Sequence, residues 1–366
     1  MYVMNLSHII LFIMKRYFLY WNRKINHGIF DKLWIKFSRF PKNISLSLSL
    51  LCPSNCIYCA ERGLGIKPKL MPFELVQKIL HEAKEIDFKG RFSLSENGEA
   101  LVNPNFKKIV EEIRKLFPEN EIVLYTNMVL MDENMCEFLL QQNLNYLHFN
   151  FDGLNEKNYE YIKQNGSYNK VKQNILNFIK LRNELNSHCS IGIGIVGAKR
   201  FSEDIEAKSR VFEDDEKKII EFFKPLLRLN DDICPNQITL EKYQYYLNRR
   251  KKEPCDLFER ILKEIFIAPN GQVYICCADF GVTSKLGNVN QAEIKEIWSS
   301  EIRKNILINL FESKNNKSFE ICQTCLPNYY SINRDLYYRV RKQVRMAFSE
   351  KQVEIINGKL IINNGE

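Results

Sequence analysis

The stretch Leu51-Cys-Pro-Ser-Asn-Cys-Ile-Tyr-Cys-Ala60 contains three cysteines, Cys52, Cys56 and Cys59, within eight residues. A structural zinc ion or a simple iron–sulfur cluster usually takes four protein ligands. The loop is therefore one ligand short of a complete metal site. Either a distant side chain or a bound small molecule must supply the missing ligand.

The residues on both sides of the cysteine loop alternate between strand and helix patterns. Polar and apolar residues alternate from Ile44 to Leu51, which predicts a strand that leads directly into the loop. The elements that we expect after it are a helix at 72–86, a strand at 92–95, a helix at 105–116, a strand at 122–125, a helix at 133–142, a strand at 146–151, a helix at 168–186, a strand at 190–196, a helix at 214–229 and a sixth strand at 237–240. This alternation is typical of βαβ units in a parallel sheet. We therefore expect the α/β class, with a partial (β/α)6 TIM-like barrel.

Polar clusters follow four of the predicted strands at the point where each strand ends. They are the cysteine loop, Gly98-Glu99, Thr126-Asn127 and Asp152-Gly153. Curled parallel sheets place their chemistry at the carboxyl ends of their strands. The four clusters are therefore expected to meet in one site.

The pattern Cys-x-x-x-Cys-x-x-Cys after the first strand, with the aromatic Tyr58 just before the third cysteine, resembles that of the radical SAM enzymes. The resemblance implies that the three cysteines hold a 4Fe–4S cluster whose fourth iron is chelated by S-adenosylmethionine (SAM). It also implies reductive cleavage of SAM to a 5′-deoxyadenosyl radical, which abstracts hydrogen from a substrate. A reducing partner such as flavodoxin or ferredoxin would then supply the electron.

The later strand ends resemble the SAM-binding turns of the same family. Asn97-Gly98-Glu99-Ala100 is similar to a Gly-Gly-Glu-Pro turn that holds the amino end of SAM, but it has Asn and Ala in place of Gly and Pro. Thr126-Asn127-Met128 is similar to a Thr-Asn-Gly turn and also lacks one glycine, and Asn150-Phe-Asp-Gly153 is similar to a Ser-x-Asp-Gly strand end. The SAM contacts that the resemblance implies are Tyr58, Gly98, Glu99, Asn127 and Asn150. Asp152 is expected to cap the following helix instead.

The strand and helix alternation stops near residue 245. Residues 265–276, with Pro269-Asn270-Gly271 at their centre, predict a β-hairpin. Leu286-Gly-Asn-Val289 and a short helix around 294–298 follow, and the chain then reaches Cys322-Gln-Thr-Cys325.

This arrangement resembles the SPASM or twitch extension of radical SAM enzymes over roughly residues 255–325. Because no cysteine follows Cys325, the resemblance implies a single auxiliary 4Fe–4S cluster. The ligands that it implies are Cys255, Cys276, Cys322 and Cys325. Cys277 competes with Cys276, since neighbouring residues of a strand point to opposite faces, and the Gly-x-x-x-x-Cys spacing from Gly271 favours Cys276.

Zinc is the main alternative at both cysteine sets. In the cysteine loop, a zinc ion could take His81 as its fourth ligand, although only the residue type supports His81. The second set also fits a structural zinc ribbon. A ferredoxin-like carrier is disfavoured because no fourth cysteine lies near the loop. The remaining cysteines, expected to be buried small apolar residues unless they point into the barrel as hydrogen donors, are Cys136, Cys189 and Cys234.

Positive charge is concentrated at the two ends of the chain, whose net charge is +9. Residues 1–43 hold eight Lys/Arg against one Asp, together with many aromatic residues. This composition suits peripheral contact with the inner face of a membrane, or packing on the enzyme body. Nucleic acid is disfavoured as a partner of this segment, because its many apolar residues would gain nothing from contact with phosphates. The odd total of eleven cysteines and the lack of a visible signal peptide indicate a reducing cytoplasm.

Four segments follow from these patterns: a basic aromatic segment at 1–43, the radical SAM barrel at 44–245, the SPASM/twitch iron–sulfur domain at 246–330 and a basic tail at 331–366. We expect a radical SAM oxidoreductase that oxidises or epimerises a small-molecule or saccharide substrate. A peptide- or protein-modifying maturase is the alternative, although no leader-peptide recognition domain is seen upstream of the barrel. A non-catalytic zinc or electron-transfer protein is a remote third reading. Glu96 and Asp279 are candidates for a general base by position only.

Overall fold

The computed structural model of the chain describes residues 40–56, 69–94, 96–195, 218–235, 258–277 and 281–311, a few isolated positions beside these ranges, and residues 352–356 and 359–363. Several predictions lie outside the described residues. They concern residues 1–37 of the N-terminal segment, Tyr58, and the auxiliary ligands Cys255, Cys322 and Cys325.

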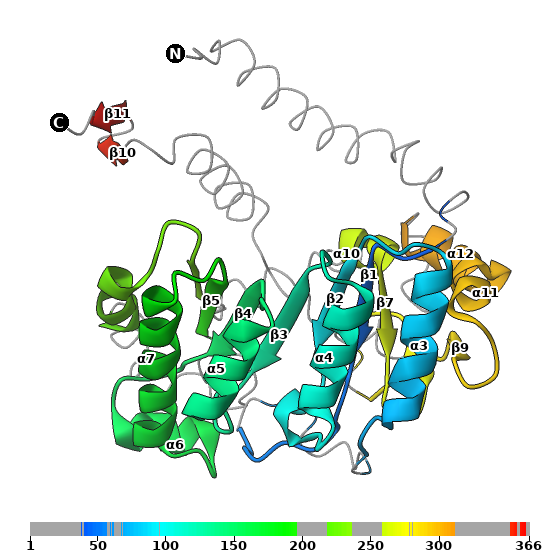
Figure 1. Cartoon of the computed structure of the whole chain (residues 1–366), viewed down its shortest axis with the longest axis horizontal. Coiled ribbons are helices and arrows are strands. Elements are labelled where there is room, and N and C mark those ends of the chain that lie inside the picture. Colours follow the sequence, from blue (N-terminus) through cyan, green and yellow to red (C-terminus); the bar gives the residue numbers. More distant parts are fainter. Residues whose placement is uncertain are drawn as a thin grey trace.

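Six parallel strands form the main sheet in the order of the chain (Figure 1). They are β1 (Asn43–Leu46), β2 (Arg91–Leu94), β3 (Ile122–Thr126), β4 (Tyr146–Asn150), β5 (Ser190–Ile195) and β6 (Asp232–Pro235). Each strand pairs with the next one in parallel. The expected α/β fold with an open, partial barrel is therefore confirmed.

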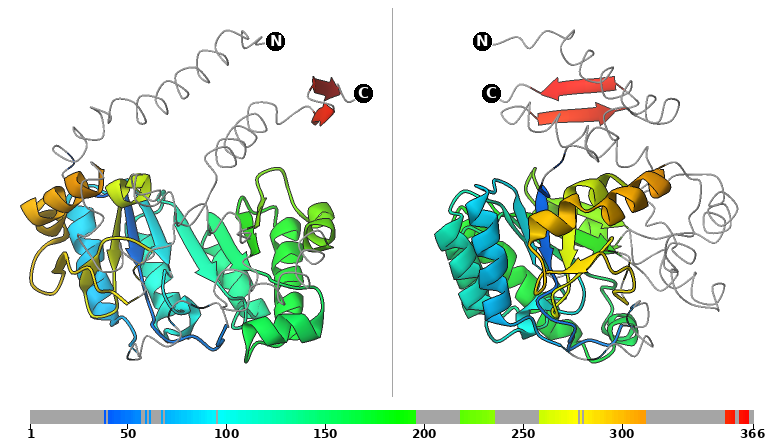
Figure 2. Two further views of the ribbon diagram at one scale, coloured as in Figure 1. Left: turned by 180° about the vertical axis from the view of Figure 1, so that it is seen from behind. Right: turned by 90° about the vertical axis from the view of Figure 1, so that its right-hand side faces the viewer.

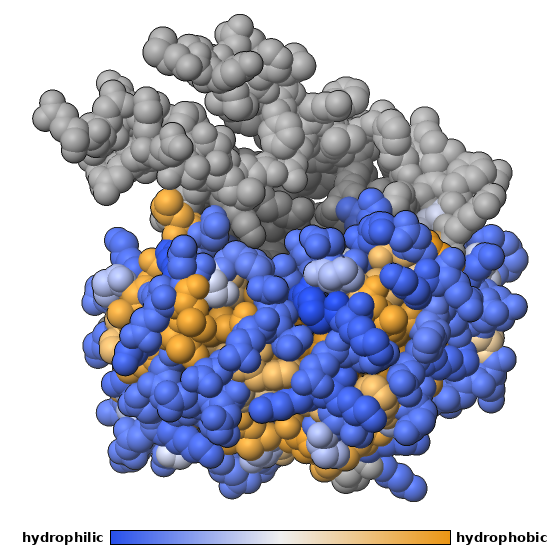
Figure 3. Space-filling view, viewed as in Figure 1, coloured by the Kyte–Doolittle hydropathy of each residue, from blue (hydrophilic) through white to orange (hydrophobic). Residues whose placement is uncertain are grey.

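Helices between these strands cover one face of the sheet (Figures 1 and 2). They are α3 (Phe73–Glu85), the 3-10 turn η1 (Ala100–Val102), α4 (Phe106–Leu116), α5 (Glu133–Gln141), α6 (Glu156–Lys163) and α7 (Tyr168–Glu184). Residues 218–223 are also helical and continue into the 3-10 turn η3 (Lys224–Leu226) before β6. The outer surface of the helices is mostly hydrophilic, and apolar side chains are visible between them (Figure 3).

Side chains alternate along the strands, so one face of the sheet is apolar and the other is polar. Leu46 pairs with Leu94, and Leu94 pairs with Leu124; all three are completely buried in the core that the helices close. Ser45 and Ser93 are paired neighbours on the opposite face. Because successive strand residues point to opposite sides, the apolar row faces the helices and the polar row faces the inside of the barrel.

The sixth strand of the sheet lies ahead of the residues where it was predicted. It was expected at 237–240, which lie outside the described residues, and the sixth strand that the structure describes is β6, from Asp232 to Pro235. Its pairing is fixed by Ile233 beside Ile193 and by the buried Asp231, whose carboxylate binds Arg182 at 2.7 Å. These long-range contacts cannot be read from local alternation, so the sequence did not predict a strand at 232–235.

The hairpin predicted after residue 264 is confirmed and extends the same sheet. β7 (Glu264–Ile267) pairs in parallel with β1, and β8 (Gln272–Tyr274) pairs antiparallel with β7. Gly271 in the turn has φ +82°, a left-handed conformation that glycine adopts without strain. β9 (Gly287–Asn288) then completes a nine-stranded sheet.

Three short helices pack around this hairpin. They are α10 (Phe258–Lys263), α11 (Ile294–Ser299) and α12 (Glu301–Phe311). The predicted helix around 294–298 is thus confirmed, whereas α10, α12 and the charged α6 were not predicted. A separate antiparallel pair, β10 (Gln352–Ile356) and β11 (Lys359–Asn363), was not predicted either.

The described part of the chain has no helix that is long and apolar enough to cross a bilayer. The predicted membrane contact of residues 1–43 falls almost entirely outside the described residues, so it stays a prediction from the sequence.

Candidate active site

The cysteine loop follows β1 at the carboxyl end of the sheet and is held by the end of α6. The backbone nitrogen of Asn55 donates to the Gln164 carbonyl at 2.7 Å, and the Asn55 side chain approaches that of Gln164 at 3.4 Å. Within the loop, the Cys59 nitrogen donates to the Cys56 carbonyl at 3.0 Å. Cys52 is exposed, while Cys56 and Cys59 are half-buried. Sequence reasoning missed Gln164, because nothing local ties it to a loop more than one hundred residues earlier.

The turn after β2 packs directly on the backbone that leads into this loop. Gly98 has φ +62°, and a Cβ atom at this position would lie 2.3 Å from the Ser49 carbonyl oxygen. The Glu99 nitrogen donates to the Leu51 carbonyl at 2.8 Å. Only glycine permits this close approach, so the turn that resembles a SAM-binding motif lies against the cysteine loop.

Glu61, which follows the last cysteine of the loop by two residues, adds a second link to the same turn. Its Oε1 atom accepts a hydrogen bond from the Gly98 nitrogen at 2.9 Å. Burial raises the pKa of the Glu61 carboxyl, and the bond from Gly98 opposes this shift. No motif pointed to Glu61 in the sequence.

Glu99 ties the end of β2 to the end of β3. Its Oε2 atom accepts hydrogen bonds from the Thr126 hydroxyl at 3.1 Å and from the Asn127 nitrogen at 2.7 Å, and Oε1 accepts from the Leu101 nitrogen at 3.3 Å. The side chain is almost completely buried, and burial raises the pKa of Glu99 to about 7 despite these bonds. A cation placed beside this carboxylate would be stabilised by it.

Asn127 connects this buried carboxylate to the cysteine loop. Its side-chain Nδ2 donates to Cys52 Sγ at 3.3 Å, and its Oδ1 accepts from the Val129 nitrogen at 2.9 Å. Desolvation by surrounding protein atoms raises the pKa of the Cys52 thiol to about 12, and negative charge on Glu99 and Cys56 adds to the shift. A cation bound to this sulfur would favour the thiolate.

Met128 stands where the similar turns of the family have glycine, and its backbone adopts φ +65°. This left-handed conformation is uncommon for residues other than glycine. The Met128 side chain is fully buried, and its carbonyl accepts a hydrogen bond from Asn174 at 2.8 Å. Burial and this bond hold the turn in the shape that the missing glycine would favour.

The residues present fit an iron–sulfur cluster and SAM in donor chemistry. Three thiols share one loop, an amide N–H points at the first sulfur, and both side-chain polar atoms of the buried Asn97 lack a hydrogen-bond partner. Buried polar groups without partners are rare in folded proteins, and a bound ligand is one way to satisfy them. Within the described residues, no three His, Cys, Asp or Glu side chains are gathered in metal-binding geometry, so the three sulfurs do not converge in this structure.

Asn150 and Asp152, at the end of β4, have different surroundings. Asn150 is half-buried on the inner face, and a Cβ atom on Gly194 of β5 would lie 2.1 Å from its Oδ1 atom. Asp152 was expected to cap the next helix, but its carboxylate forms a buried ion pair with Lys163 at 2.9 Å. Asn155 caps α6 instead, because its side chain accepts the Asn158 N–H at 3.2 Å.

Inside the barrel, an ionic cluster joins β1, β7, α10 and the turn after β2. Arg260 binds Glu96 at 2.5 Å and Glu264 at 2.5 Å, and Ser45 lies between the two carboxylates. Burial is the main cause that raises the pKa of Glu96. Glu96 is thus engaged by a guanidinium, which argues against a free general base at this position.

Asp279, the other general-base candidate, is hydrogen-bonded to the loop that follows it. It is completely buried, and its two oxygens accept hydrogen bonds from the backbone and hydroxyl groups of Thr283 and Ser284. Both Asp279 oxygens are thus occupied by groups of its own loop, which argues against a free general base at this position.

The two neighbouring cysteines of the hairpin have different surroundings. Cys276 is buried and belongs to the main apolar core. Cys277 is half-buried and packs with Phe266 and Tyr274, within electrostatic reach of Arg260. The choice between them as a cluster ligand stays a prediction, since the other three proposed ligands lie outside the described residues. Of the remaining cysteines, Cys136 and Cys189 are buried as expected.

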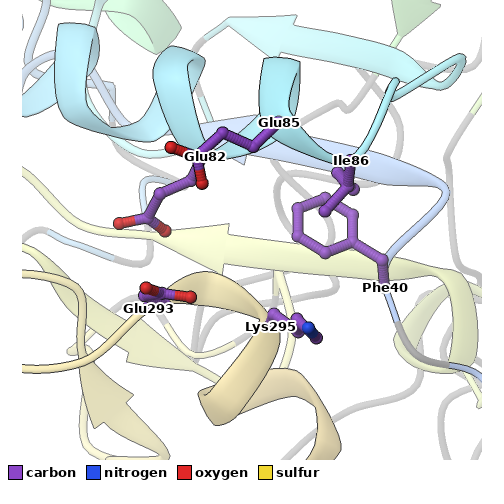
Figure 4. A pocket seen from close by; sticks show the side chains of 6 residues that line it. All are labelled: Phe40, Glu82, Glu85, Ile86, Glu293 and Lys295. Atoms are coloured by element: carbon purple, nitrogen blue, oxygen red, sulfur yellow. The ribbon is translucent and has the colours of Figure 1, made fainter.

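A cavity of about 220 Å³ lies between α3 and α11 (Figure 4). It is lined by Phe40, Glu82, Glu85, Ile86, Glu293 and Lys295. Glu82 is engaged by the Ile294 nitrogen at 2.8 Å and by Lys78. Phe40 in the wall of this cavity precedes β1, whereas the cysteine loop follows the end of β1. The cavity is therefore separate from the cysteines.

Two family models match the chain. Residues 46–206 match the radical SAM superfamily, and residues 255–326 match SPASM, an iron–sulfur cluster-binding domain. The first match contains the cysteine loop and the turns of β2 to β4. The second contains all four cysteines proposed as auxiliary ligands.

Characterised relatives match at low identity. A biotin synthase of Methanococcus maripaludis is 28% identical over 167 residues, 45% of this chain and 48% of that protein. A GTP 3′,8-cyclase of Peptoclostridium acidaminophilum is 31% identical over 36% of this chain and 41% of its own length. The chain thus spans about half the length of such relatives or less. A cofactor-modifying protein of the tungsten-containing aldehyde ferredoxin oxidoreductase of Pyrococcus furiosus is 23% identical over 71% of this chain and 81% of that one.

Solved structures confirm the fold. The native anSMEcpe structure with bound AdoMet has a TM-score of 0.53 at 16% identity, covering 83% of this chain and 97% of the other. SuiB of Streptococcus suis bound to S-adenosylmethionine has a TM-score of 0.50 at 15% identity, covering 78% and 72%.

Proposed function

Because the chain belongs to the radical SAM superfamily and carries a SPASM iron–sulfur domain, we propose that it is a radical SAM oxidoreductase that oxidises or epimerises a small or saccharide substrate. The cofactors of such a protein are 4Fe–4S clusters and SAM. When bound, they supply the 5′-deoxyadenosyl radical that removes a hydrogen atom from the substrate.

The observation that carries this proposal is the set of contacts around the cysteine loop. Asn127 reaches Cys52 at 3.3 Å, and its backbone nitrogen reaches Glu99 at 2.7 Å. Gly98 and Glu99 in turn bind the loop through Glu61 and Leu51. A cluster on the cysteines and a SAM ammonium beside Glu99 would therefore be neighbours.

The roles proposed for the residues follow from their chemistry. Cys52, Cys56 and Cys59 would hold the first cluster, with Tyr58 beside them, while Gly98 and Glu99 would hold the SAM amino group. Asn127 would orient Cys52 through its N–H donor, and Asn150 would bind the SAM ribose. The auxiliary cluster would be held by Cys255, Cys276, Cys322 and Cys325.

Peptide modification is the second candidate. It is favoured by the extent of the structural likeness, since the anSMEcpe structure with AdoMet and the Cp18Cys peptide covers 83% of this chain and 96% of that one. At 16% identity this likeness shows a shared fold. That a peptide is also the substrate of this chain is our second proposal.

The test uses the full chain reconstituted without oxygen with iron and sulfide. With dithionite and SAM, we expect release of 5′-deoxyadenosine and an iron content of roughly eight per chain. Alanine at Cys52, Cys56 and Cys59 together should abolish the release and remove about half of the iron, whereas Cys136→Ala, a buried cysteine on α5, should change neither.

Two outcomes would contradict the proposal. Stoichiometric zinc in place of iron supports the zinc readings, and an iron-loaded chain that releases no 5′-deoxyadenosine is not a radical SAM enzyme. Transfer of deuterium from labelled sugars or from labelled peptides into 5′-deoxyadenosine separates the two substrate classes.

A further inference from the structure

The inner face of β4 carries a row of three polar side chains. Tyr146, His148 and Asn150 alternate along the strand, and their partners across on β5 are Ser190, Gly192 and Gly194. A Cβ atom on Gly192 would lie 1.8 Å from the Tyr146 hydroxyl, and one on Gly194 would lie 2.1 Å from Asn150 Oδ1. Because the two glycines have no side chains, the Tyr146 and Asn150 side chains can lie over them.

The row is hydrogen-bonded and still accessible to solvent. The Tyr146 hydroxyl lies 3.2 Å from His148 Nδ1, and Asn150 hydrogen-bonds His148 on its other side. The Tyr125 ring of β3 lies 5.4 Å from the His148 ring. All four side chains are half-buried, although they stand on central strands whose two edges are both paired. We call Tyr125, Tyr146 and His148 the inner wall; Asn150 borders it and is the residue assigned to the SAM ribose.

The inner wall is electrically neutral. Burial lowers the pKa of His148 to about 4, so its imidazole is uncharged at neutral pH. The charged side chains within reach of Tyr125 are two cations and two anions, namely Arg91, Arg260, Glu96 and Glu264. An anionic ligand would need an unbalanced cation, and the described residues of this region do not supply one.

Strand β2, which pairs with β3, and the turn after it carry buried polar atoms without a hydrogen-bond partner. The Ser93 hydroxyl is completely buried on the inner face and has no hydrogen-bond partner, and the buried side-chain amide of Asn97 has none either. Leaving such buried groups without a hydrogen-bond partner costs stability. A ligand rich in hydroxyl groups would satisfy them.

We propose that the inner wall binds the substrate of the reaction and selects a small, uncharged, hydroxyl-rich molecule of the saccharide or polyol class. Neutral donors and acceptors interleaved with aromatic rings match the hydroxyl groups and C–H surfaces of such a molecule. A peptide bound by strand addition would need an open strand edge, and β4 and β5 have none. This inference rests on the proposed function, because it names the substrate class of the same barrel.

The test measures binding to the full chain, reconstituted and loaded with SAM, by saturation-transfer-difference NMR. The probes are myo-inositol and N-acetylglucosamine as neutral polyols, glucose 6-phosphate as an anion and an eight-residue peptide containing Ser and Cys. We expect the neutral probes to bind with millimolar affinity. His148→Phe, which keeps an aromatic ring but loses both nitrogens, should weaken them about tenfold or more.

Three further variants make the result specific. His148→Gln should recover part of the binding, because an amide replaces the ring nitrogens. Gly192→Ala should weaken binding by displacing Tyr146, independently of the histidine. His188→Phe is the matched control, since His188 is exposed at the start of β5 and contacts Asn145; it should leave binding unchanged.

Three results would contradict the proposed substrate site. Tighter binding of glucose 6-phosphate or of the peptide, no binding of any neutral probe, or unchanged binding in both His148→Phe and Gly192→Ala would overturn the inner wall as the substrate site. Basal SAM cleavage without any probe is measured in the same samples. Its absence from a chain that still binds the neutral probes would defeat the proposed function and leave the binding site standing.

Discussion

At the scale of single residues, the site depends on groups kept in costly states by their neighbours. Glu99 is buried with a pKa of about 7, and Met128 adopts a left-handed backbone conformation that favours glycine. Such strained or poorly solvated groups are typical of functional sites, because a ligand relieves the cost when it binds.

Glu99→Gln tests the buried carboxylate. The folded-state pKa is raised from 4.5 to about 7, so ionisation costs stability as the pH rises through this window, by about 3 kcal/mol above it. We expect the Gln variant and the unsubstituted chain to melt alike near pH 4.5. At pH 8 the variant should be more stable by about 2 to 3 kcal/mol in thermal melts without SAM.

The same substitution should weaken SAM binding by about tenfold or more, because the ammonium loses its anionic partner. Calorimetric titration with SAM at pH 8 measures this. A variant that is less stable at pH 8, or that binds SAM as tightly as before, would show that Glu99 is a purely structural residue.

Gly98→Ala tests the close backbone approach. A Cβ atom would collide with the Ser49 carbonyl, so the turn must move away from the cysteine loop. We expect SAM affinity to fall at least about tenfold, as measured by the same titration. Gly153→Ala is the control in a neighbouring strand-end turn, because its Cβ atom would have only ordinary contacts, with the nearest atom at 3.5 Å. Equal affinity of the two variants would count against the assigned role of Gly98.

At the scale of elements, buried ion pairs fix how helices and strands meet. Arg182 on α7 binds both oxygens of Asp231 at 2.7 Å, and Asp231 also accepts the Ile191 N–H at 2.8 Å. Lys163 at the end of α6 binds Asp152 after β4. These pairs lie at opposite ends of the strands, so one sets the start of β6 and the other supports the cysteine loop.

Arg182→Met tests the first pair. It leaves the Asp231 carboxylate buried without its charged partner, and we expect the free energy of unfolding to fall by about 3 to 5 kcal/mol. Denaturant titration measures the loss. Lys180→Met, which removes an exposed lysine of the same helix whose nearest acid is Glu184 at 3.8 Å, should cost less than about 1 kcal/mol. Similar losses in the two variants would contradict the importance of the buried pair.

At the scale of the whole molecule, the C-terminal extension and the barrel share one sheet. β7 pairs with β1 over four residues, and Arg260 on α10 binds Glu96 of the barrel. Glu96 immediately precedes the turn that contains Gly98 and Glu99. Among the described residues, this ionic cluster links the iron–sulfur extension to the turn of the proposed SAM site.

Arg260→Met tests this junction. It leaves Glu96 and Glu264 together without a guanidinium, and we expect the chain to lose about 3 to 5 kcal/mol of stability in denaturant titrations. Adding Glu96→Gln to the same chain should restore part of the loss, because one uncompensated charge disappears. Purely additive losses would mean that the two residues act separately.

The sequence by itself determined the α/β class, the hairpin extension, the first five strands and the family. These features follow from local alternation and from short motifs such as the cysteine spacing, which depend only on neighbouring residues. It also indicated the turns at Gly98, Thr126 and Asn150, because each follows a recognisable strand. Where the local pattern was weak, as in the charged α6 and the short strand β6, the sequence did not predict the element.

Only the tertiary structure decided which groups meet. The bonds from Gly98 to Glu61, from Asn127 to Cys52 and from Arg260 to Glu96 join residues 37, 75 and 164 positions apart. The lean of Tyr146 and Asn150 over two glycines likewise depends on how β4 and β5 are paired. Contacts at such separations are set by sheet register and by the burial of charge, and neither quantity is written in any short stretch of the chain.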